Sequence, residues 1–389
     1  MRIGLDYINA LGVGGLSTYS QNLIESLALI DEENQYFLGN YCHDFLPGRS
    51  RQKFNNPNFK LAPVYVSPLG LSLPEKFMAA VNRRSVKLNY KLRRLDFFHF
   101  TNPLNYVLGV KCGIVTIHDL ALLHNRTWAK DYVVSAFVDN IGKIIGESKR
   151  IIADSEFTKN DIVKFFSTDE KKISVIHLAA SAKYYPDIDR EYLAAEFGLK
   201  NFIFYAGQLQ PRKNILRLLE AYSLLPNDLK DRYQLILAGR PRNQEFLSEI
   251  NKALERFNLV GQVKIMGFVS NTDLRKLYSC AKFFVYPSLF EGFGLPILEA
   301  YNCGTPVITS NTSSLPEVAG TKAAILVDPE DVKTLGAAME KLLVDQELYE
   351  SLKSHALLEA KKFSWQATAE KTKAVYEDVY RELKQNYGR

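Results

Sequence analysis

The sequence predicts an α/β protein made of two doubly wound domains, each with a parallel sheet. The chain has 389 residues, more than one hydrophobic core usually holds, so two domains are expected. The second half alternates short β-rich runs with helical stretches, which is the pattern of βαβ units. The first half alternates in the same way, although less regularly.

Short runs rich in branched and aromatic residues are the predicted strands. In the first half they are 3–6, 36–39, 97–100, 114–118, 151–154 and 174–176. In the second half they are 202–206, 234–238, 263–267, 283–286, 306–309 and 324–327. Residues 183–187 carry the proline and acidic residue of a linker, which predicts domains over 1–187 and 188–364. The last helical stretch, about 365–389, has no following strand and is expected to pack back on the first domain.

Composition bounds the class of protein. Its 47% hydrophobic and 24% charged residues are typical of a folded protein. The N-terminus lacks the features of a signal peptide and no apolar run approaches about 18 residues, so a cytosolic protein is expected. Four widely separated cysteines argue against zinc knuckles and disulfides. The net charge of +6 lies mostly in the first half and suggests an anionic partner, which we do not expect to be nucleic acid.

The clearest functional motif is the run FEGFGLPILEA at 290–300, which follows a predicted strand. Its glycines allow close backbone approach to a ligand, and amides at the start of a helix can bind oxygens. Glu291 and Glu299 could accept hydrogen bonds from two sets of sugar hydroxyls. The plainer interpretation is two solvated acids with two turn glycines.

A second motif, YAGQLQPRKN at 205–214, also follows a strand. Arg212 and Lys213 near a helix start would place two cations beside backbone amides, a setting that suits a diphosphate. Such donors can stabilise a charged leaving group as a metal ion does in other enzymes. An ordinary basic helix face is the alternative.

Two features of the first half complete the candidate site. The loop from Gly12 to Ser17, with Gly14 and Gly15, precedes a helix and could contact a phosphate or an acceptor, or be a plain turn. His118 ends a predicted strand on the side where ligands of parallel sheets bind. A neutral imidazole there could hydrogen-bond a sugar hydroxyl or steady positive charge near an anomeric carbon.

Two further segments carry charge patterns that bear on metal and lipid binding. Asp187 and Asp189 form an acid-x-acid pattern like that of metal-binding transferases, but they lie in the linker, so no metal site is expected. Residues 83–95 interleave basic with apolar side chains and could rest on anionic lipid. A solvated basic face is the alternative interpretation of that segment.

These motifs together resemble the retaining glycosyltransferases of group 1 (family 4), and the resemblance runs through nearly the whole chain. It implies the GT-B fold, in which two Rossmann-like doubly wound domains face each other across a cleft. The pair Glu291 and Glu299 resembles that family's paired-glutamate signature, and Arg212-Lys213 resembles its diphosphate-binding pair. Tyr301 departs from the commonest pattern, in which a methionine follows the alanine after the second glutamate.

The resemblance also implies roles for individual residues. Glu299 would bind the donor ribose, and Glu291 would hold the transferred sugar together with the amides of Phe293, Gly294 and Leu295. His118 would contact that sugar from the other domain. The resemblance also implies donor contacts from Gly14, Gly15, Gly207, Phe268 and Val269. Residues 311–314 would add loop contacts near the phosphates.

The predicted reaction follows from this resemblance. A hexose, on general similarity mannose from GDP-mannose, would pass to a hydroxyl of a glycan or lipid-linked acceptor of bacterial polysaccharide or lipopolysaccharide assembly. The enzyme would need no metal and no cofactor, and would work in the cytosol or at the inner face of the cytoplasmic membrane. Retention normally suggests a carboxylate nucleophile on the face opposite the leaving group, and none is evident near His118 or the glycine loop. Together with the resemblance, this leads us to expect attack on the face that the diphosphate leaves.

Three alternatives remain. One is a UDP-sugar donor with the same fold, and another is a GT-B nucleotide-sugar epimerase, which needs no acceptor. The third is a dinucleotide-dependent oxidoreductase that uses Gly12-x-Gly14, but it leaves Arg212, Lys213 and the two glutamates unexplained.

Overall fold

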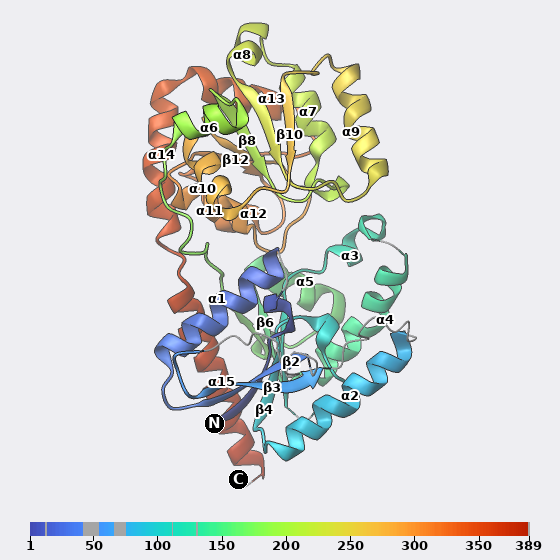
Figure 1. Cartoon of the computed structure of the whole chain (residues 1–389). Coiled ribbons are helices and arrows are strands. Elements are labelled where there is room, and N and C mark those ends of the chain that lie inside the picture. Colours follow the sequence, from blue (N-terminus) through green and yellow to red (C-terminus); the bar gives the residue numbers. More distant parts are fainter. Residues whose placement is uncertain (12–13, 42–53, 66–74, 111, 130, 388–389) are drawn as a thin grey trace. The chain divides into compact units, whose positions relative to one another are not determined.

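The structure is a computed structural model that describes residues 1–11, 14–41, 54–65, 75–110, 112–129 and 131–387. The chain divides into two compact units (Figure 1), Met1–Leu178 with Trp365–Arg389 and Ala179–Ser364. Each unit has a parallel sheet covered by helices, so the predicted fold class is confirmed. None of the described helices is both long and apolar enough to cross a bilayer.

The sheet of the first unit has seven strands among the described residues, in the order β3-β2-β1-β4-β5-β6-β7, all parallel. The strands are β1 Arg2–Asp6, β2 Gln35–Tyr41, β3 Phe59–Tyr65, β4 Phe97–Phe100, β5 Gly113–Ile117, β6 Arg150–Ala153 and β7 Ile173–Val175. The order reverses between β1 and β4, and open parallel sheets bind ligands at such a reversal.

Strand β3 was not predicted from the sequence. It contains Pro63, which cannot donate to a strand ladder and so argues against a strand in a sequence pattern. The structure places β3 at the edge of the sheet, where it pairs only with β2 among the described residues. A proline is tolerated at an edge because one side of the strand needs no partner.

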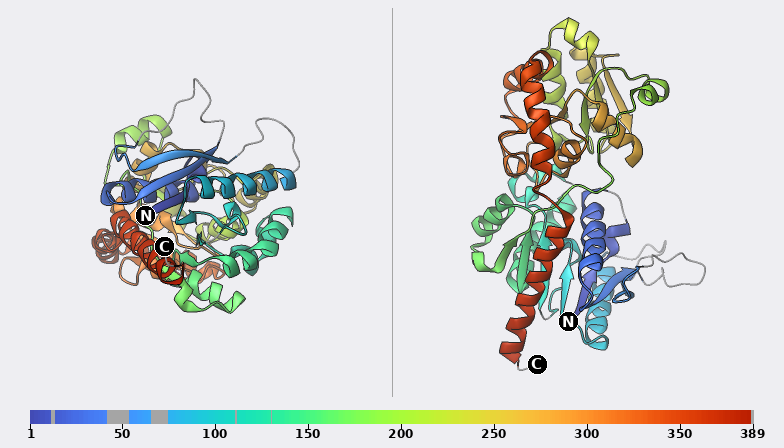
Figure 2. Two further views of the ribbon diagram at one scale, coloured as in Figure 1. Left: turned by 90° about the horizontal axis from the view of Figure 1, so that it is seen from below. Right: turned by 90° about the vertical axis from the view of Figure 1, so that its left-hand side faces the viewer.

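The helices of the first unit are α1 Gly15–Ile30, α2 Glu75–Leu92, α3 Ala121–His124, α4 Asp131–Glu147, α5 Glu156–Phe166 and α15 Trp365–Tyr387. The last of these packs against α1 (Figure 2), and its far end lies near the N-terminus of the chain. Its stripe of Ala369, Thr372, Tyr376 and Val379 is buried at helical spacing. The C-terminal helix therefore belongs to the first unit.

The sheet of the second unit has six strands among the described residues, in the order β10-β9-β8-β11-β12-β13. The strands are β8 Phe202–Ala206, β9 Gln234–Ala238, β10 Val263–Gly267, β11 Phe284–Tyr286, β12 Val307–Ser310 and β13 Ala324–Val327. The helices are α6 Arg190–Phe197, α7 Ile215–Ser223, α8 Asn227–Arg232, α9 Gln244–Arg256, α10 Asn271–Cys280, α11 Leu295–Asn302, α12 Leu315–Ala319, α13 Val332–Val344 and α14 Gln346–Ala360. Here the strand order reverses between β8 and β11.

The boundary between the units falls after Leu178, earlier than the predicted position near 187. Contacts with α10 attach the intervening residues to the second unit. The amide of Asp187 donates to Ser279 Oγ at 2.9 Å, and Arg275 forms an ion pair with Asp187 at 2.7 Å. The proline and acids that suggest a linker therefore form a segment docked on a helix.

Candidate donor site

The strongest polar cluster of the second unit lies where its strand order reverses. The loop after β8 leads into a short 3-10 helix, Pro211–Lys213, and the loop after β11 carries Glu291. A backbone hydrogen bond connects the two loops, in which the amide of Leu289 donates to the carbonyl of Arg212 at 2.9 Å. Two motifs almost 80 residues apart thus meet at the carboxyl edge of one sheet, as predicted for ligand-binding loops.

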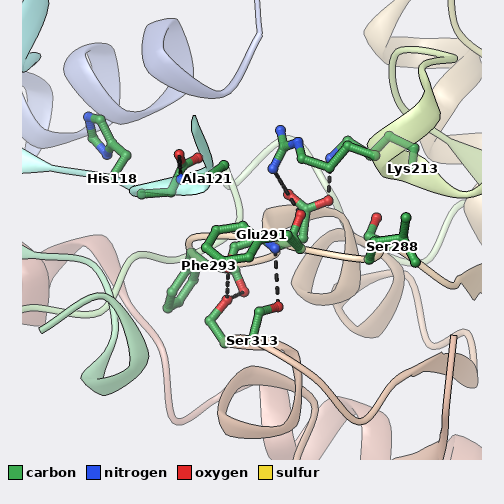
Figure 3. Close-up of polar contacts among 12 residues, drawn as sticks. His118, Ala121, Lys213, Ser288, Glu291, Phe293 and Ser313 are labelled. Atoms are coloured by element: carbon green, nitrogen blue, oxygen red, sulfur yellow. Dashed lines mark hydrogen bonds and ion pairs between the residues drawn. The ribbon is translucent and has the colours of Figure 1, made fainter. Parts of the chain in front are cut away.

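Glu291 contacts both predicted diphosphate cations, and Figure 3 shows it beside Lys213. The ammonium of Lys213 donates to one carboxylate oxygen of Glu291 and, at 2.6 Å, to the hydroxyl of Tyr286. Arg212 Nη1 lies 3.5 Å from the other oxygen and donates to the carbonyl of Phe290 at 2.9 Å. Lys213 and Glu291 are both buried, so the site contains paired charges that are shielded from solvent.

This arrangement fixes the charge of Glu291. Burial alone would raise the pKa of its carboxyl, but the charges of Lys213 and Arg212 and the accompanying hydrogen bonds lower that pKa to about 2. Glu291 is therefore ionised at every physiological pH. A donor diphosphate that binds the two cations has to compete with it.

Polar contacts to the segment before α12 hold the 291–294 loop in shape. The amide of Glu291 donates to Ser313 Oγ at 3.1 Å, while Ser314 Oγ donates to the carbonyls of Glu291 and Phe293, both at 2.9 Å. Gly294 has a φ of 112°, where a side chain would be strained and its Cβ would lie 2.9 Å from Leu315. The loop then enters α11, whose first turn has no side-chain cap.

Glu299, in the second turn of α11, has tyrosine partners. Tyr278 on α10 donates to Glu299 Oε2 at 3.0 Å, and Tyr184 also hydrogen-bonds this carboxyl. Burial raises the pKa of Glu299 to about 7, against the lowering effect of these two hydrogen bonds. The two tyrosines were not identified from the sequence, because one lies in the apparent linker and the other on a helix remote in the chain.

This pKa makes donor binding sensitive to pH if Glu299 holds the ribose. An ionised carboxylate accepts hydrogen bonds from hydroxyls more strongly than a protonated one. Affinity for an intact sugar nucleotide should therefore rise by about tenfold from pH 6 to pH 8. Calorimetric titration at both pH values measures this change, and an intact sugar nucleotide is the right probe because its diphosphate does not titrate in that interval.

The control is Glu299→Gln, which should bind more weakly and with no such pH dependence. An equal pH dependence in the variant would assign the effect to another group.

Loops after β8, β9 and β10 lie side by side. The amide of Gly207 donates to the carbonyl of Ala238, and that of Gly239 to the carbonyl of Gly267. A Cβ on Gly239 would lie 1.8 Å from the Gly207 carbonyl oxygen, so only glycine allows this approach. Phe268 is exposed at the end of this row with the guanidinium of Arg240 over its ring, at 5.3 Å from the centroid. Val269 follows it and is partly exposed.

Both acids of the acid-x-acid pattern form ion pairs with basic side chains of α10. Asp187 pairs with Arg275, while Asp189 pairs with Lys276 and caps α6 through the amide of Tyr192. These acids therefore have a structural role on α6 and α10. Among the described residues, no group of three or more His, Cys, Asp or Glu side chains could hold a metal ion.

In the first unit, the glycine loop opens α1. Gly14 has a φ of 98° and precedes the first helical residue, Gly15. Among the described residues, no atom lies within 4 Å of a Cβ placed on either glycine. Gly12 and Val13, the other part of the motif, lie outside the described residues.

His118 follows β5 and is held on both sides. Its Nδ1 lies 2.6 Å from Asp154 Oδ2, and its Nε2 lies 2.8 Å from the carbonyl oxygen of Thr101. The ring of Tyr19, on α1, meets the imidazole edge to face with centroids 4.8 Å apart. The imidazole is therefore fixed in orientation by elements on three sides.

Two acids that were not predicted as site residues from the sequence lie near His118 and the glycine loop. Asp154 contacts His118 directly, and Asp6 ends β1 just before the loop, with Asn105 Nδ2 donating to it at 2.7 Å. Both carboxyls are buried, and burial raises the pKa of Asp6 to about 7. Asp154 lies beside His118 because Ile117 and Ala153 pair in register, and His118 and Asp154 are the residues that follow them.

The site residues thus form two groups. The second unit brings together Arg212, Lys213 and Glu291, with Glu299 one helix turn further on. The first unit supplies His118 and the glycines at the start of α1.

Comparison with known proteins agrees with this geometry. Residues 193–359 match the family of glycosyl transferases group 1. O-antigen chain mannosyltransferase B of Escherichia coli is 32% identical over 373 residues, which cover 93% of this chain and 95% of that protein. The chain therefore belongs to the group 1 glycosyltransferases.

Solved structures show the same fold at lower identity. Sucrose-phosphate synthase from Thermosynechococcus elongatus superimposes with a TM-score of 0.79 at 20% identity, over 98% of this chain and 99% of that one. HepE of Anabaena, solved in complex with UDP and glucose, gives a TM-score of 0.74 at 17% identity, over 97% and 100% of the two chains.

Proposed function

We propose that this glycosyltransferase is a retaining, metal-independent enzyme that moves mannose from GDP-mannose to a hydroxyl of a glycan or lipid-linked acceptor. The observation that carries the proposal is the cluster of Arg212, Lys213 and Glu291 where the strand order reverses. It provides two fixed cations for a diphosphate and one ionised acid for sugar hydroxyls. Membership of the group 1 family supports this use of the cluster.

In this proposal each part of the donor has its own residues. Arg212 and Lys213 bind the diphosphate, and Glu291 holds the sugar together with the amides of Phe293, Gly294 and Leu295. Glu299 binds the ribose. The base lies beside Phe268 and Val269, with Gly207 allowing close approach at the neighbouring loop, and the first unit contributes His118, Gly14 and Gly15.

The chemistry proposed is attack on the face that the diphosphate leaves. The acceptor oxygen forms the new bond to the anomeric carbon as the bond between that carbon and the leaving phosphate oxygen breaks. The leaving phosphate oxygen takes the acceptor proton. Arg212 and Lys213 stabilise the negative charge that develops on the diphosphate. Asp154 and Asp6, the acids found near His118 and the glycine loop, are buried, which favours this route over a covalent intermediate on either carboxylate.

The choice of mannose depends on similarity to the E. coli O-antigen chain mannosyltransferase, which extends over 93% of this chain. The same similarity supports an acceptor of surface-polysaccharide assembly and a place at the inner face of the cytoplasmic membrane. A UDP-sugar is the second candidate donor, because HepE was solved with UDP and glucose.

A donor screen tests the proposal. Ligands that bind the folded state raise the melting temperature by mass action, so GDP-mannose should stabilise the enzyme more than UDP-, ADP- or dTDP-sugars. Incubation with GDP-mannose and a mannosylated acceptor should then give a product whose new linkage is α by proton NMR. A larger shift of the melting temperature with a UDP-sugar would make that sugar nucleotide the donor in place of GDP-mannose. A β linkage in the product would exclude retention. Release of free nucleotide without acceptor would favour an epimerase.

The segment 83–95, most of which lies in α2, is proposed as a membrane contact. Arg84, Leu88 and Lys91 are exposed at spacings of four and three residues, whereas Val86 is buried against the unit. Basic and apolar side chains thus share the outer face of the helix. Such a face binds anionic lipid by charge and by burial of its apolar residues.

The double variant Arg84→Glu with Lys91→Glu should lower binding to anionic vesicles by about tenfold or more, since each basic residue near the surface contributes about 1 kcal/mol. Vesicle co-sedimentation measures this. The matched control reverses Lys252 and Arg256, two exposed basic residues on α9 of the second unit. Equal loss in both variants would indicate an effect of net charge alone.

A further inference from the structure

The contacts of His118 define which of its ring nitrogens carry hydrogen. A backbone carbonyl accepts and cannot donate, so Nε2, at 2.8 Å from the carbonyl oxygen of Thr101, must carry a hydrogen. An ionised carboxylate also only accepts, so Nδ1, at 2.6 Å from Asp154 Oδ2, must carry one as well. A neutral imidazole has only one such hydrogen, which leaves one of the two contacts without a donor.

The surroundings of Asp154 favour the charged pair. Asp154 is 2% exposed, and its second oxygen, Oδ1, has no hydrogen-bond partner within the part of the chain that the structure describes. A buried carboxylate without compensation is costly, and His118 is the cationic partner at hand. The short, charge-assisted contact between them is the form that such compensation takes.

The other titratable groups facing His118 agree with a charged ring. Burial lowers the pKa of His118, but the charge of Asp154, its hydrogen bond, the Thr101 carbonyl and Asp119 together raise it. Tyr19, packed against the ring, stays protonated because burial raises the pKa of its hydroxyl. His99, one strand away, is neutral because burial and the charge of His118 lower its pKa to about 3.

We propose that Asp154 is a positioning residue that keeps His118 protonated at both ring nitrogens, so that His118 offers substrate an N–H donor and no lone pair. The inference depends on the proposed function, which assigns His118 to the transferred sugar. The hydrogen that the Thr101 carbonyl accepts is the one that a sugar or phosphate oxygen would share. His118 then cannot be the base that takes the acceptor proton, and this replaces the neutral imidazole expected from the sequence.

The chain contains a matched control for this pair. His124 Nε2 lies 2.6 Å from Asp161 Oδ2, the same separation as between His118 and Asp154, and Asp161 is also buried. Both pairs belong to the first unit, but Asp161 has no part in the proposed site. The variants Asp154→Asn and Asp161→Asn therefore remove the same charge from the same kind of contact.

Nitrogen-15 NMR of the full-length enzyme with labelled histidine tests the proposal directly. At neutral pH, wild-type His118, assigned by its loss in His118→Gln, should show two protonated ring nitrogens. In Asp154→Asn one of them should lose its hydrogen, and in Asp161→Asn the His118 signals should not change. A wild-type His118 with one unprotonated nitrogen overturns the proposal, and this result needs no variant to fold.

The pH dependence of kcat provides a second test of the proposal. With a sugar nucleotide and acceptor, wild-type kcat should stay level from about pH 6 to pH 8. In Asp154→Asn it should fall by about tenfold or more over that interval, because a histidine without a carboxylate partner ordinarily has a pKa of about 6.5 and loses its charge between pH 6 and pH 8. Asp161→Asn should follow the wild type.

A level profile in a folded Asp154→Asn enzyme would overturn the proposal. An enzyme that transfers no sugar but has a doubly protonated His118 would instead contradict the proposed function, so the two failures can be told apart.

Discussion

Replacing Lys213 by alanine should lower turnover by about 10²-fold or more while changing donor affinity much less. The ammonium of Lys213 is held by Tyr286 and Glu291 at the end of β11, so it is placed before the donor arrives. A cation fixed in advance stabilises leaving-group charge without reorganisation when the bond breaks. Steady-state kinetics of transfer, with calorimetric measurement of donor binding, separate the two effects.

A loss of stability has to be distinguished from a loss of catalysis in this variant. Without Lys213 the buried carboxylate of Glu291 keeps only Arg212 as a cation among its described contacts. Unfolding in denaturant should therefore be monitored beside the kinetics. Lys230→Ala is a suitable control, because that lysine donates to the carbonyl of Ser223 in the same unit and has no place in the site. Equal turnover of Lys213→Ala and wild type would remove Lys213 from the catalytic residues.

Glu291→Gln should destabilise the enzyme by about 3 kcal/mol at neutral pH, because breaking a buried ion pair leaves an uncompensated charge on Lys213. The same change should reduce transfer, since Glu291 is the proposed acceptor of sugar hydroxyls. Chemical denaturation and the transfer assay measure the two losses independently. A variant as stable as the parent at pH 7 would show that the pair of Lys213 and Glu291 contributes nothing to the folded state.

The pH dependence of this loss has a definite sign. The folded pKa of Glu291 is lowered to about 2, so the ionised form is favoured by folding. Its contribution to stability is complete above the unfolded pKa of about 4.5 and is lost as pH falls toward 2. The difference in stability between Glu291→Gln and wild type should therefore shrink between pH 5 and pH 2. A difference that stays constant over that range would contradict the assignment.

Nucleotide should also act differently on the two proteins. In wild type, Glu291 pairs with Arg212 and Lys213, the two cations that the diphosphate would bind. Removing the charge of Glu291 removes this competition, so GDP should stabilise the variant more than it stabilises wild type. Melting temperatures with and without GDP measure this.

The parts of the site that sequence could predict are those set by strand ends. Glu291, Arg212 and His118 each follow a β-rich run, and parallel sheets bring such positions to one edge. The turn glycines could also be predicted, because Gly14, Gly207 and Gly294 have backbone angles that other residues rarely adopt.

Pairings between distant segments could not be predicted in the same way. Asp154 lies beside His118 because β5 and β6 are neighbours in register, which a single sequence does not state. Tyr184 and Tyr278 reach Glu299 because the segment before α6 docks on α10. Motif spacing also gave no sign that Glu291 would pair with the two cations assigned to the diphosphate, since that contact depends on how two loops fold together.

We propose that side-chain cations do the work that a metal ion does in other transferases, so the rate of mannose transfer should not depend on a bound metal ion. The enzyme is dialysed against EDTA and assayed with GDP-mannose and acceptor, then again after manganese or magnesium is restored. The rate should be the same in all three assays. A rate that falls to background with EDTA and recovers with manganese would contradict it.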